Sequence, residues 1–589
     1  MVSTSIRSDV SILGLHVTGD QTAAAVFREG QLVAAVAEER LNRQKRSRSF
    51  PKKAIRYCLE SAKLNSLNDV DYIVVPWNPA AHMKRINMSG FTNWRRYDPE
   101  WLYIVPNQLM EFLDVPDAAA TILDLTQQGK SKIVYVNHHQ AHIGWAFASP
   151  FEEAAVAIID EYGESTSFTL GSVRGNDVSI EKELPFPHSL GVFYATFTQL
   201  LGFTPNSDEW KVMGAAAYGD PQRYRSKIQQ LIRCHDGGVW LDQDYFEFAN
   251  TRFAGYYSQS LPRHLEFAPR TRDEPLVQKH YDMAAACQAV FEHMLFSILT
   301  WLHERVRMPR LVMNGGCCMN SLANGKVTLQ TPFEEVFVSP APADNGACIG
   351  GPLWLLHSLT KKGTSFRVPI SPYTGPSYDQ EHIRTLLERY KLHYRESMDV
   401  CADIVGLLSC GMIVGWFQGR MEFGERALGN RSILADPRDE GMKDKINRSV
   451  KYRESFRPFA PSIVAEAADA YFELPPGGDS RYMDRVFAVR PNKRHLIPAV
   501  VHKDGTGRLQ IVRREDNELF YRLIQKFGEE TGVPVLLNTS FNLNGEPIVE
   551  SPDDALRTYL TSGIDVVVLG NFVVEKMPRG EKLPGYVPA

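Results

Sequence analysis

The sequence predicts an α/β protein of two domains, and three observations support this. At 589 residues the chain is longer than a single hydrophobic core usually serves. Strand-like apolar runs alternate with helical patterns along most of its length. Residues 361–380 are rich in Pro, Gly and Ser and show no periodicity, which is typical of a linker. We therefore expect one domain over residues 1–365 and a second over residues 366–589.

The first domain opens with a predicted β-meander, in which turns near Gly19-Asp20 and at Gly30 separate three short strands. An amphipathic helical pattern follows at residues 52–64. A long helical pattern comes later, at residues 281–306. Further strands are predicted at residues 71–77, 132–137, 155–160, 310–316 and 335–341.

The second domain shows the same mixture of patterns. Helices are predicted at residues 381–390, 403–411, 442–451 and 517–532. Strands are predicted at residues 412–418, 533–539 and 565–576, and a basic loop follows the first of them. The whole chain therefore has the pattern of an α/β fold, with no detectable sequence repeat.

Composition excludes some classes of partner. Hydrophobic residues make up 44% and charged residues 23%, and the formal net charge is -4, so neither nucleic acid nor an anionic membrane is an expected partner. No apolar run approaches the ~20 residues of a membrane span, and the N-terminus lacks a signal-peptide pattern. The eight cysteines show no metal-binding or redox spacing. A cytoplasmic protein is expected, as a monomer or homodimer.

Four residues form a candidate metal site. His138 and His142 are four apart, so on a helix both imidazoles project from one face. Asp160 and Asp344 each follow a predicted strand, where open α/β sheets bind ligands. Two His and two Asp suit Fe²⁺ or Mn²⁺ better than a thiolate-seeking ion. The alternative is that the histidines only cap or pack on their helix.

A second candidate site is basic and follows the linker. Cations gather among glycines, prolines and aromatic residues between residues 415 and 462, so they are predicted to be held in place and to bind phosphate. A solvated charged face is the alternative. Polar residues that follow the strand at residues 533–539 could bind phosphate or a carbamoyl amide, or could form a plain turn. These two groups comprise Arg426, Arg431, Lys443, Lys451, Arg453 and Arg457, and Asn538, Thr539, Ser540 and Asn542.

Ten motifs, taken together and in order, give the chain a resemblance to a known family. They are AEERLNRQKR, HHQAH, DEYGE, EWKVMGAAAYG, NGGCCMNS, PAPADNG, GWFQGRMEFGERALGNRSILADPR, FRPFAPS, DGTGRLQ and LLNTSFNLNGEPIVESPDDA. They resemble the O-carbamoyltransferases that modify nodulation factors, cephalosporins, ansamycins and aminoglycosides. The resemblance spans nearly the whole chain.

The resemblance implies an N-terminal actin-like ATPase-type (ASKHA) domain and a C-terminal YrdC-like α/β domain. It implies that the C-terminal domain makes carbamoyl-adenylate from ATP, with Mg²⁺, and carbamoyl phosphate. The N-terminal domain, with an iron-type metal, would pass the carbamoyl group to a hydroxylated small-molecule acceptor. By motif match the metal ligands would be His138, His142, Asp160 and Asp344.

The same resemblance assigns the substrate-binding residues. In the first domain Gly315, Gly316 and Asn320 would contact the adenylate. In the second domain ATP and carbamoyl phosphate would be held by Arg426, Arg431, Lys451, Arg453, Arg457, Arg508, Ser540 and Asn542, with Lys451 and Arg457 also acting in catalysis.

One departure leaves the general base open. Where the family has His-Asp in its first strand turn, this chain has Gly19-Asp20, so Asp20 remains a catalytic candidate without its usual neighbour. His16 and His139 are the candidates to remove the acceptor proton, and the alternative is that the adenylate phosphate takes it.

The acceptor itself cannot be identified from the sequence. Its pocket is expected to involve residues 185–210 and the aromatic residues Trp94, Tyr97, Trp101 and Tyr103, which could also be core residues. Rival functions are a tRNA-modifying threonylcarbamoyl transferase and an ASKHA-type small-molecule kinase.

Overall fold

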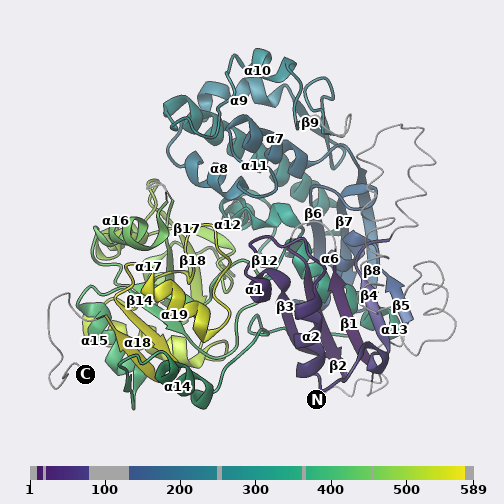
Figure 1. Ribbon diagram of the computed structural model, residues 1–589. Helices are drawn as coiled ribbons and strands as arrows, with labels where there is room; N and C mark the ends of the chain where they lie inside the picture. Colours follow the sequence, from purple (N-terminus) through teal and green to yellow (C-terminus); the bar gives the residue numbers. More distant parts are fainter. Residues whose placement is uncertain are drawn as a thin grey trace.

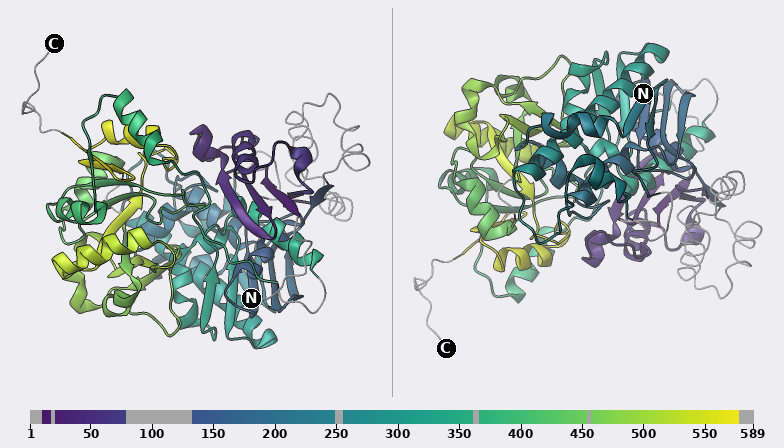
Figure 2. Two further views of the ribbon diagram at one scale, coloured as in Figure 1. Left: turned by 90° about the horizontal axis from the view of Figure 1, so that it is seen from below. Right: turned by 90° about the horizontal axis from the view of Figure 1, so that it is seen from above.

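A computed structural model describes residues 10–17, 21–78, 132–248, 255–360, 366–453 and 457–576. Figure 1 shows an N-terminal part, purple to teal, beside a C-terminal part, green to yellow, and both views in Figure 2 show the same arrangement. The described strands of the N-terminal part all precede residue 339, and those of the C-terminal sheet all follow residue 394. The predicted α/β class is confirmed.

The N-terminal part contains two five-stranded sheets of identical topology. In the first, the order is β3-β2-β1-β4-β5, and in the second it is β12-β11-β6-β7-β8. Each begins with an antiparallel meander, and its last two strands run parallel to the first. This repeat, invisible in the sequence, agrees with the actin-like class. The strands are β1 (Ser11–His16), β2 (Ala23–Arg28), β3 (Gln31–Ala37), β4 (Tyr72–Val75), β5 (Lys132–Tyr135), β6 (Glu153–Ile159), β7 (Thr166–Arg174), β8 (Asp177–Pro185), β11 (Arg310–Asn314) and β12 (Glu335–Val338).

Helices cover both faces of each sheet. Between the sheets lie α6 (His138–Gly144) and α13 (Ala347–Leu359), whose apolar residues share one core with β1, β2 and β6. They pack very closely, since a Cβ on Gly350 would lie 2.0 Å from the Ala141 carbonyl oxygen. Outside lie α1 (Glu38–Asn42), α2 (Lys52–Ser61), α7 (Leu190–Leu200), α8 (Glu209–Ala216), α9 (Gln222–Gln229), α10 (Ser260–Leu265), α11 (Gln278–Val306) and α12 (Ser321–Gln330), with the hairpin β9 (Ile232–His235) and β10 (Gly238–Leu241).

Among the described residues one helix, α11, is long and apolar enough to cross a membrane, and 72% of its apolar window is buried in the protein. The expectation that no run approaches this length is therefore wrong for α11. Its residues Met283, Phe291 and Leu295 belong to the core that covers the second sheet, so α11 packs as a core helix here.

The C-terminal part is built on one mixed sheet of nine described strands, in the order β13-β21-β20-β14-β15-β19-β16-β18-β17. Helices α15 and α18 cover one face, while α14, α16 and α19 cover the other. The strands are β13 (Arg395–Glu396), β14 (Val414–Phe417), β15 (Arg431–Ala435), β16 (Ala460–Val464), β17 (Arg485–Ala488), β18 (Thr506–Val512), β19 (Val535–Ser540), β20 (Val566–Leu569) and β21 (Phe572–Glu575), and the helices are α14 (Gln380–Arg389), α15 (Val400–Ser409), α16 (Met442–Ile446), α17 (Ala468–Tyr471), α18 (Glu518–Thr531) and α19 (Pro552–Leu560).

Two sequence predictions in the C-terminal part are wrong. The predicted basic loop contains β15, a central strand, because its apolar residues Ile433 and Leu434 pack on opposite faces of the sheet. The single strand predicted at residues 565–576 is a hairpin, since Gly570 adopts a positive φ of 57° and reverses the chain between β20 and β21.

Close contacts join the two parts. Helix α12 packs on β17, where a Cβ on Gly325 would lie 2.0 Å from the Val486 carbonyl oxygen. After α1, Arg43 donates to the Pro547 and Ile548 carbonyl oxygens at 2.9 and 2.6 Å. The two parts are therefore in direct contact, through closely packed backbone at Gly325 and through hydrogen bonds from the Arg43 side chain.

We predict that Gly325→Ala destabilises the protein by about 1–3 kcal/mol, because the added methyl group would overlap backbone that cannot move aside. The measurement is thermal unfolding of the full chain. Gly406→Ala in α15 is the matched control, since its Cβ would meet no atom within 4 Å, and it should leave the melting temperature unchanged or slightly raised. Equal melting temperatures for Gly325→Ala and the unchanged chain would contradict the described packing.

Candidate metal centre and anion pocket

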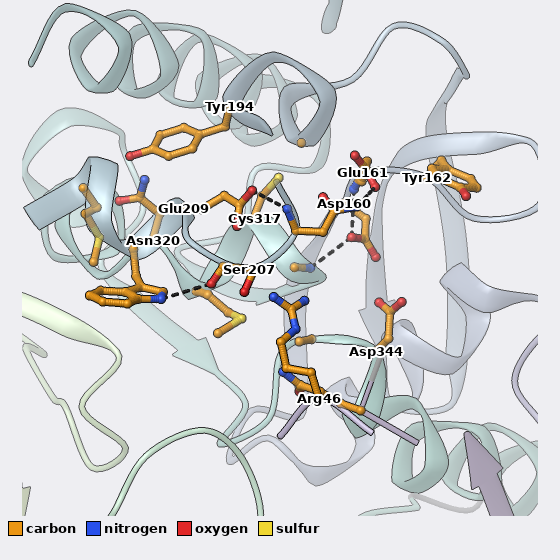
Figure 3. A pocket seen from close by; sticks show the side chains of 18 of the residues that line it. Arg46, Asp160, Glu161, Tyr162, Tyr194, Ser207, Glu209, Cys317, Asn320 and Asp344 are labelled. Atoms are coloured by element: carbon orange, nitrogen blue, oxygen red, sulfur yellow. Dashed lines mark hydrogen bonds between the residues drawn. The ribbon is translucent and has the colours of Figure 1, made fainter. Parts of the chain in front are cut away.

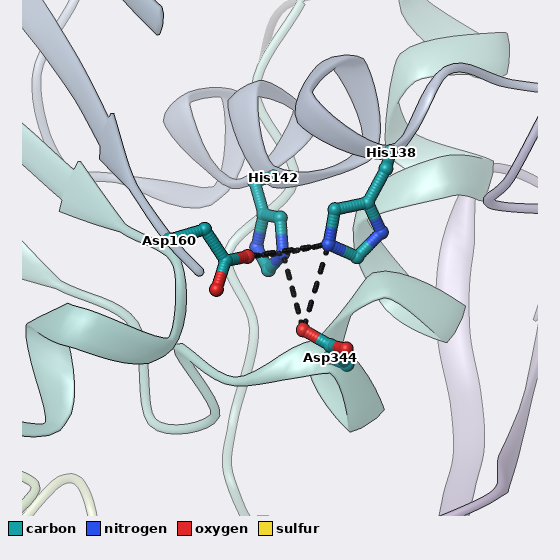
Figure 4. A group of neighbouring side chains, drawn as sticks. All are labelled: His138, His142, Asp160 and Asp344. Atoms are coloured by element: carbon teal, nitrogen blue, oxygen red, sulfur yellow. Dashed lines mark hydrogen bonds and ion pairs between the residues drawn. The ribbon is translucent and has the colours of Figure 1, made fainter. Parts of the chain in front are cut away.

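The four predicted metal ligands meet at one point, as Figure 4 shows. His138 and His142 project from the same face of α6, while Asp160 follows β6 and Asp344 follows β12. One potential ligand atom from each lies within 4.8 Å of the others. Because β6 and β12 both run parallel to β11, their carboxyl ends share one edge of the second sheet.

Neighbouring groups orient the donor atoms. His138 Nδ1 lies 3.4 Å from the Pro76 carbonyl oxygen, which favours the tautomer that leaves the Nε2 lone pair free. Asp160 Oδ1 accepts from the backbone N–H groups of Glu161 and Gly316 at 2.8 and 3.2 Å, and Oδ2 faces the histidines. These contacts are the supporting shell that a metal centre requires.

The donor set fits a divalent ion. The two Nε2 atoms face each other at 3.1 Å. Two nitrogens bound to one ion at ~2.1 Å in adjacent positions stand about 3 Å apart. His138 Nε2 also lies 3.2 Å from Asp160 and 3.5 Å from Asp344. Two nitrogen and two carboxylate donors suit iron or manganese.

Charge is concentrated at this cluster. Burial lowers the His138 pKa, but the carboxylates of Asp344 and Asp160 outweigh burial and hold that pKa well above its usual value. Burial raises the Asp160 pKa, yet hydrogen bonds from His138 and His142 bring it well below its usual value. A divalent ion would take the place of the imidazole proton between the same carboxylates.

The candidate bases occupy different positions. His16 ends β1 near Asp344. Burial raises the Asp344 pKa, but His138, with a smaller contribution from His16, brings it below its usual value. His139 points away, with Nδ1 at 2.8 Å from Thr169 Oγ1 and 3.1 Å from Thr166 Oγ1, and it does not line the cavity beside the metal ligands. Burial lowers the His139 pKa to about 3. Asp20 lies outside the described residues, as do Trp94, Tyr97, Trp101 and Tyr103.

A cavity of about 430 Å³ opens beside the cluster (Figure 3). Asp160 and Asp344 form part of its wall, and Arg46 points into it from the segment after α1. Aromatic side chains and two further acidic residues, Glu161 and Glu209, form much of the rest of the cavity wall. Its lining includes Trp77, Glu161, Tyr162, Tyr194, Asn206, Ser207, Glu209, Trp210, Phe291, Gly316, Asn320 and Arg426.

The two further acids give the cavity an acidic side. Glu161 accepts hydrogen bonds from Tyr256 Oη at 2.9 Å and from Asn206 Nδ2 at 3.0 Å. Burial raises the Glu161 pKa to about 8, and the nearby carboxylates of Glu209 and Asp160 also raise it. Burial raises the Glu209 pKa as well.

The predicted adenylate contacts lie at the same edge of the sheet. Gly315 adopts a φ of 97°, and a Cβ there would lie 2.4 Å from the Ile159 carbonyl oxygen, so this turn requires glycine. Gly316 and Asn320 line the cavity, and Asn320 also caps α12 and exchanges two hydrogen bonds with Gln288.

A cluster of cations borders this cavity from the C-terminal part. Burial lowers the Lys451 pKa well below its usual value, and Arg453, Arg457 and Lys45 lower it further. Burial likewise lowers the Arg508 pKa, and Arg426, Arg453 and Arg457 add to the effect. Among the described residues, the neighbouring charges that shift the pKa values of Lys451 and Arg508 are positive, which is the electrostatic environment of a polyanion site.

Two members of the cluster connect it to the cavity. Arg426, predicted in the second site, reaches the wall of the cavity beside the metal ligands. The guanidinium of Arg457 stacks on Trp210, another wall residue, at 3.9 Å from the ring centre. Arg453 stacks on Phe459 at 4.5 Å and donates to Asn447. The two sites predicted from sequence therefore adjoin.

Lys451, Ser540 and Asn542 are linked to one another. Lys451 Nζ donates to the Ser540 carbonyl oxygen at 2.5 Å, and to the carbonyl and side-chain oxygens of Asn542 at 2.9 and 3.0 Å. These acceptors use all three ammonium protons. As placed, Lys451 thus holds the loop after β19 while adding its charge to the cluster.

Arg431 departs from its predicted role. All five guanidinium N–H donors reach carbonyl oxygens, those of Gln418, Asn430, Pro376, Gly419 and Glu550. The side chain also stacks on Phe417 at 3.6 Å. This arrangement leaves no donor for phosphate, so Arg431 ties together the loops around β15 instead.

Comparisons with known proteins agree with this organisation. Residues 11–353 match the family model "Carbamoyltransferase N-terminus" and residues 405–576 match "Carbamoyltransferase C-terminus". The chain belongs to the carbamoyltransferase family.

Similar proteins include an uncharacterized protein of Synechocystis, 36% identical over 97% of each chain. The nodulation protein NolNO of Sinorhizobium fredii is 36% identical over 94% of this chain and 78% of its own. A 3'-hydroxymethylcephem-O-carbamoyltransferase of Amycolatopsis lactamdurans is 32% identical over 45% of this chain and 49% of its own. The crystal structure of T. kodakarensis HypF aligns at a TM-score of 0.31 with 12% identity over 61% of this chain and 49% of its own, which is too low to carry an argument.

Sequence reasoning missed several cavity residues of this carbamoyltransferase. Glu161 lies in the DEYGE motif and Glu209 and Trp210 in EWKVMGAAAYG, but these motifs served only as marks of the family. Arg46 lies in AEERLNRQKR, far from the other cavity residues in sequence. An acid beside a metal ligand, as in Asp160-Glu161, is a signal that could have identified Glu161.

We predict that His142→Ala lowers the affinity of the carbamoyltransferase for Fe²⁺ or Mn²⁺ at least tenfold, because it removes one of four ligands. Metal content after dialysis against a fixed free-metal concentration measures this. His139→Ala is the matched control and should keep its metal, since that ring faces Thr166 and Thr169. Full metal content in His142→Ala would show that the ion binds elsewhere.

Proposed function

We propose that this carbamoyltransferase is an ATP-dependent O-carbamoyltransferase. It would form carbamoyl-adenylate from carbamoyl phosphate and ATP in the basic cluster, and transfer the carbamoyl group to a hydroxyl of a small-molecule acceptor beside the metal ligands. The observation that carries the proposal is the adjacency of a cluster of buried cations and a buried two-His, two-Asp cluster, with Arg426 lining the cavity between them.

The basic cluster suits the first half-reaction. Water would attack the phosphorus of carbamoyl phosphate and break its P–O bond, which gives inorganic phosphate and carbamate. A carbamate oxygen would then attack the α-phosphorus of ATP and expel pyrophosphate. Both substrates are polyanions, so charges from Lys451, Arg457 and Arg508 would gather them and stabilise the charge that develops. Holding the carbamate in a partly closed pocket would limit its loss to water.

The cavity suits the second half-reaction. The acceptor oxygen forms a bond to the carbamoyl carbon, and AMP leaves with the electron pair of the broken C–O bond. His138, His142, Asp160 and Asp344 would hold Fe²⁺ or Mn²⁺, which supplies Lewis-acid polarisation when bound. Of the two candidate bases, His16 lies near Asp344 and His139 faces Thr166 and Thr169, and neither lines the cavity. The proposal therefore keeps both histidines and the adenylate phosphate as candidates to take the hydroxyl proton.

The cavity walls limit the acceptor to a class. Trp77, Tyr162 and Trp210 offer apolar faces for a ring system, while Glu161 and Glu209 offer acceptors for hydroxyl or amino groups. The proposed acceptor is therefore a hydroxylated small molecule with a ring and further hydrogen-bond donors. A cytoplasmic location, where ATP is available, goes with this proposal.

We predict that the half-reactions separate by mutation. Asp344→Ala should abolish acceptor carbamoylation and leave carbamoyl-phosphate-dependent pyrophosphate release within about threefold, because Asp344 lies among the metal ligands. Arg508→Gln should lower pyrophosphate release about tenfold to a hundredfold, since it removes a charge-assisted contact worth about 1.5–3 kcal/mol. Supplied carbamoyl-adenylate should restore transfer by Arg508→Gln.

The controls are pyrophosphate and carbamoylated-product assays on the same folded preparations. Loss of both activities in Asp344→Ala, or no rescue of Arg508→Gln, would refute the division between the sites. Release of ADP in place of pyrophosphate would favour a kinase.

A further inference from the structure

A second, smaller cavity of about 40 Å³ lies where β18 meets α8 and α12. Its lining includes Arg508 and His502, together with Lys443, Lys503 and Asp504. Arg508 is the residue that connects it with the basic cluster, because the Arg508 pKa responds to Arg453 and Arg457.

The hydrogen bonds around His502 determine its tautomer. Thr506 Oγ1 lies 2.7 Å from Asp504 Oδ1 and 3.0 Å from His502 Nδ1. A carboxylate only accepts, so the single hydroxyl proton of Thr506 points to Asp504. Thr506 Oγ1 can then only accept from His502, which places the imidazole proton on Nδ1. The Nε2 atom therefore carries a lone pair.

That lone pair is buried and has no hydrogen-bond partner among the described residues. The imidazole is also neutral, because burial lowers the His502 pKa to about 4, with Arg508 and Lys443 lowering it and Asp504 opposing them. A buried acceptor without a partner is costly, so a ligand group that donates a hydrogen bond to it would be favoured.

Arg508 offers the complementary group in the same cavity. Its Nε–H donor is buried, and it too has no partner in the part of the chain that the structure describes. His502 and Arg508, the residues that carry this acceptor and this donor, thus both line a space large enough for a few atoms. A planar primary carbamoyl group presents the matching pair, a carbonyl oxygen that accepts and an NH₂ that donates.

Building on the proposed function, we propose that His502 is a specificity-determining residue that recognises the carbamoyl NH₂, with its Nε2 accepting from the amide while Arg508 donates to the carbonyl oxygen or the adjoining phosphate. Carboxylic acyl phosphates with a methyl group in place of NH₂ leave the His502 lone pair unpaired and bind more weakly. The charge of Arg508 alone cannot make this distinction.

The test compares two stable phosphonates binding to the full chain by calorimetry: phosphonoacetamide, which carries the NH₂, and acetonylphosphonate, which carries a methyl group there. The unchanged protein should bind phosphonoacetamide at least tenfold more tightly. His502→Asn can donate to Thr506 but places no acceptor at the Nε2 position, so its preference should fall below threefold.

His502→Gln is the matched counterpart, since its amide oxygen reaches the Nε2 position, and it should retain part of the preference. The inference is overturned if His502→Asn keeps the full preference for phosphonoacetamide. It is also overturned if His502→Gln shows a smaller preference than His502→Asn. Thermal unfolding confirms that each variant is folded. Carbamoyl-phosphate-dependent pyrophosphate release by the unchanged protein is measured in parallel, and its absence contradicts the proposed function without deciding the role of His502.

Discussion

Repulsion between gathered cations is the constraint on which the site depends. Lys451 and Arg508 are buried among positive neighbours, and burial and those neighbours together lower their pKa values. Such a cluster is stable only if the surrounding fold holds it in place. The backbone contacts of Lys451 with the loop after β19, and those of α1 and α12 with the C-terminal part, provide that support.

The same contacts explain why two parts of the chain form one site. The duplicated sheets bring three parallel strand ends to one edge, which places Asp160, Gly316 and Asp344 together. Arg426 and Arg457 then approach that edge from the other part. A carbamoyltransferase that carries a reactive intermediate between two steps benefits from this proximity, because a short path limits loss to water.

Sequence patterns predicted the strand ends and the grouping of the four candidate metal ligands because both follow simple periodicities: residues i and i+4 on a helix, and an acid after an apolar strand. They failed where tertiary context decides. Arg431 looked like a phosphate ligand, yet five carbonyl oxygens from separate segments surround it. Glu209 and His502 line cavities together with residues distant in sequence, so no local pattern could place them there.

The central claim is that the basic cluster activates a carbamoyl group as an adenylate independently of the metal ligands. The most direct measurement is exchange of labelled pyrophosphate into ATP, without acceptor, in His142→Ala, a variant of a metal ligand. The account predicts exchange that requires carbamoyl phosphate and proceeds at a rate close to that of the unchanged protein. No exchange in either protein, with ATP converted to ADP, would contradict it.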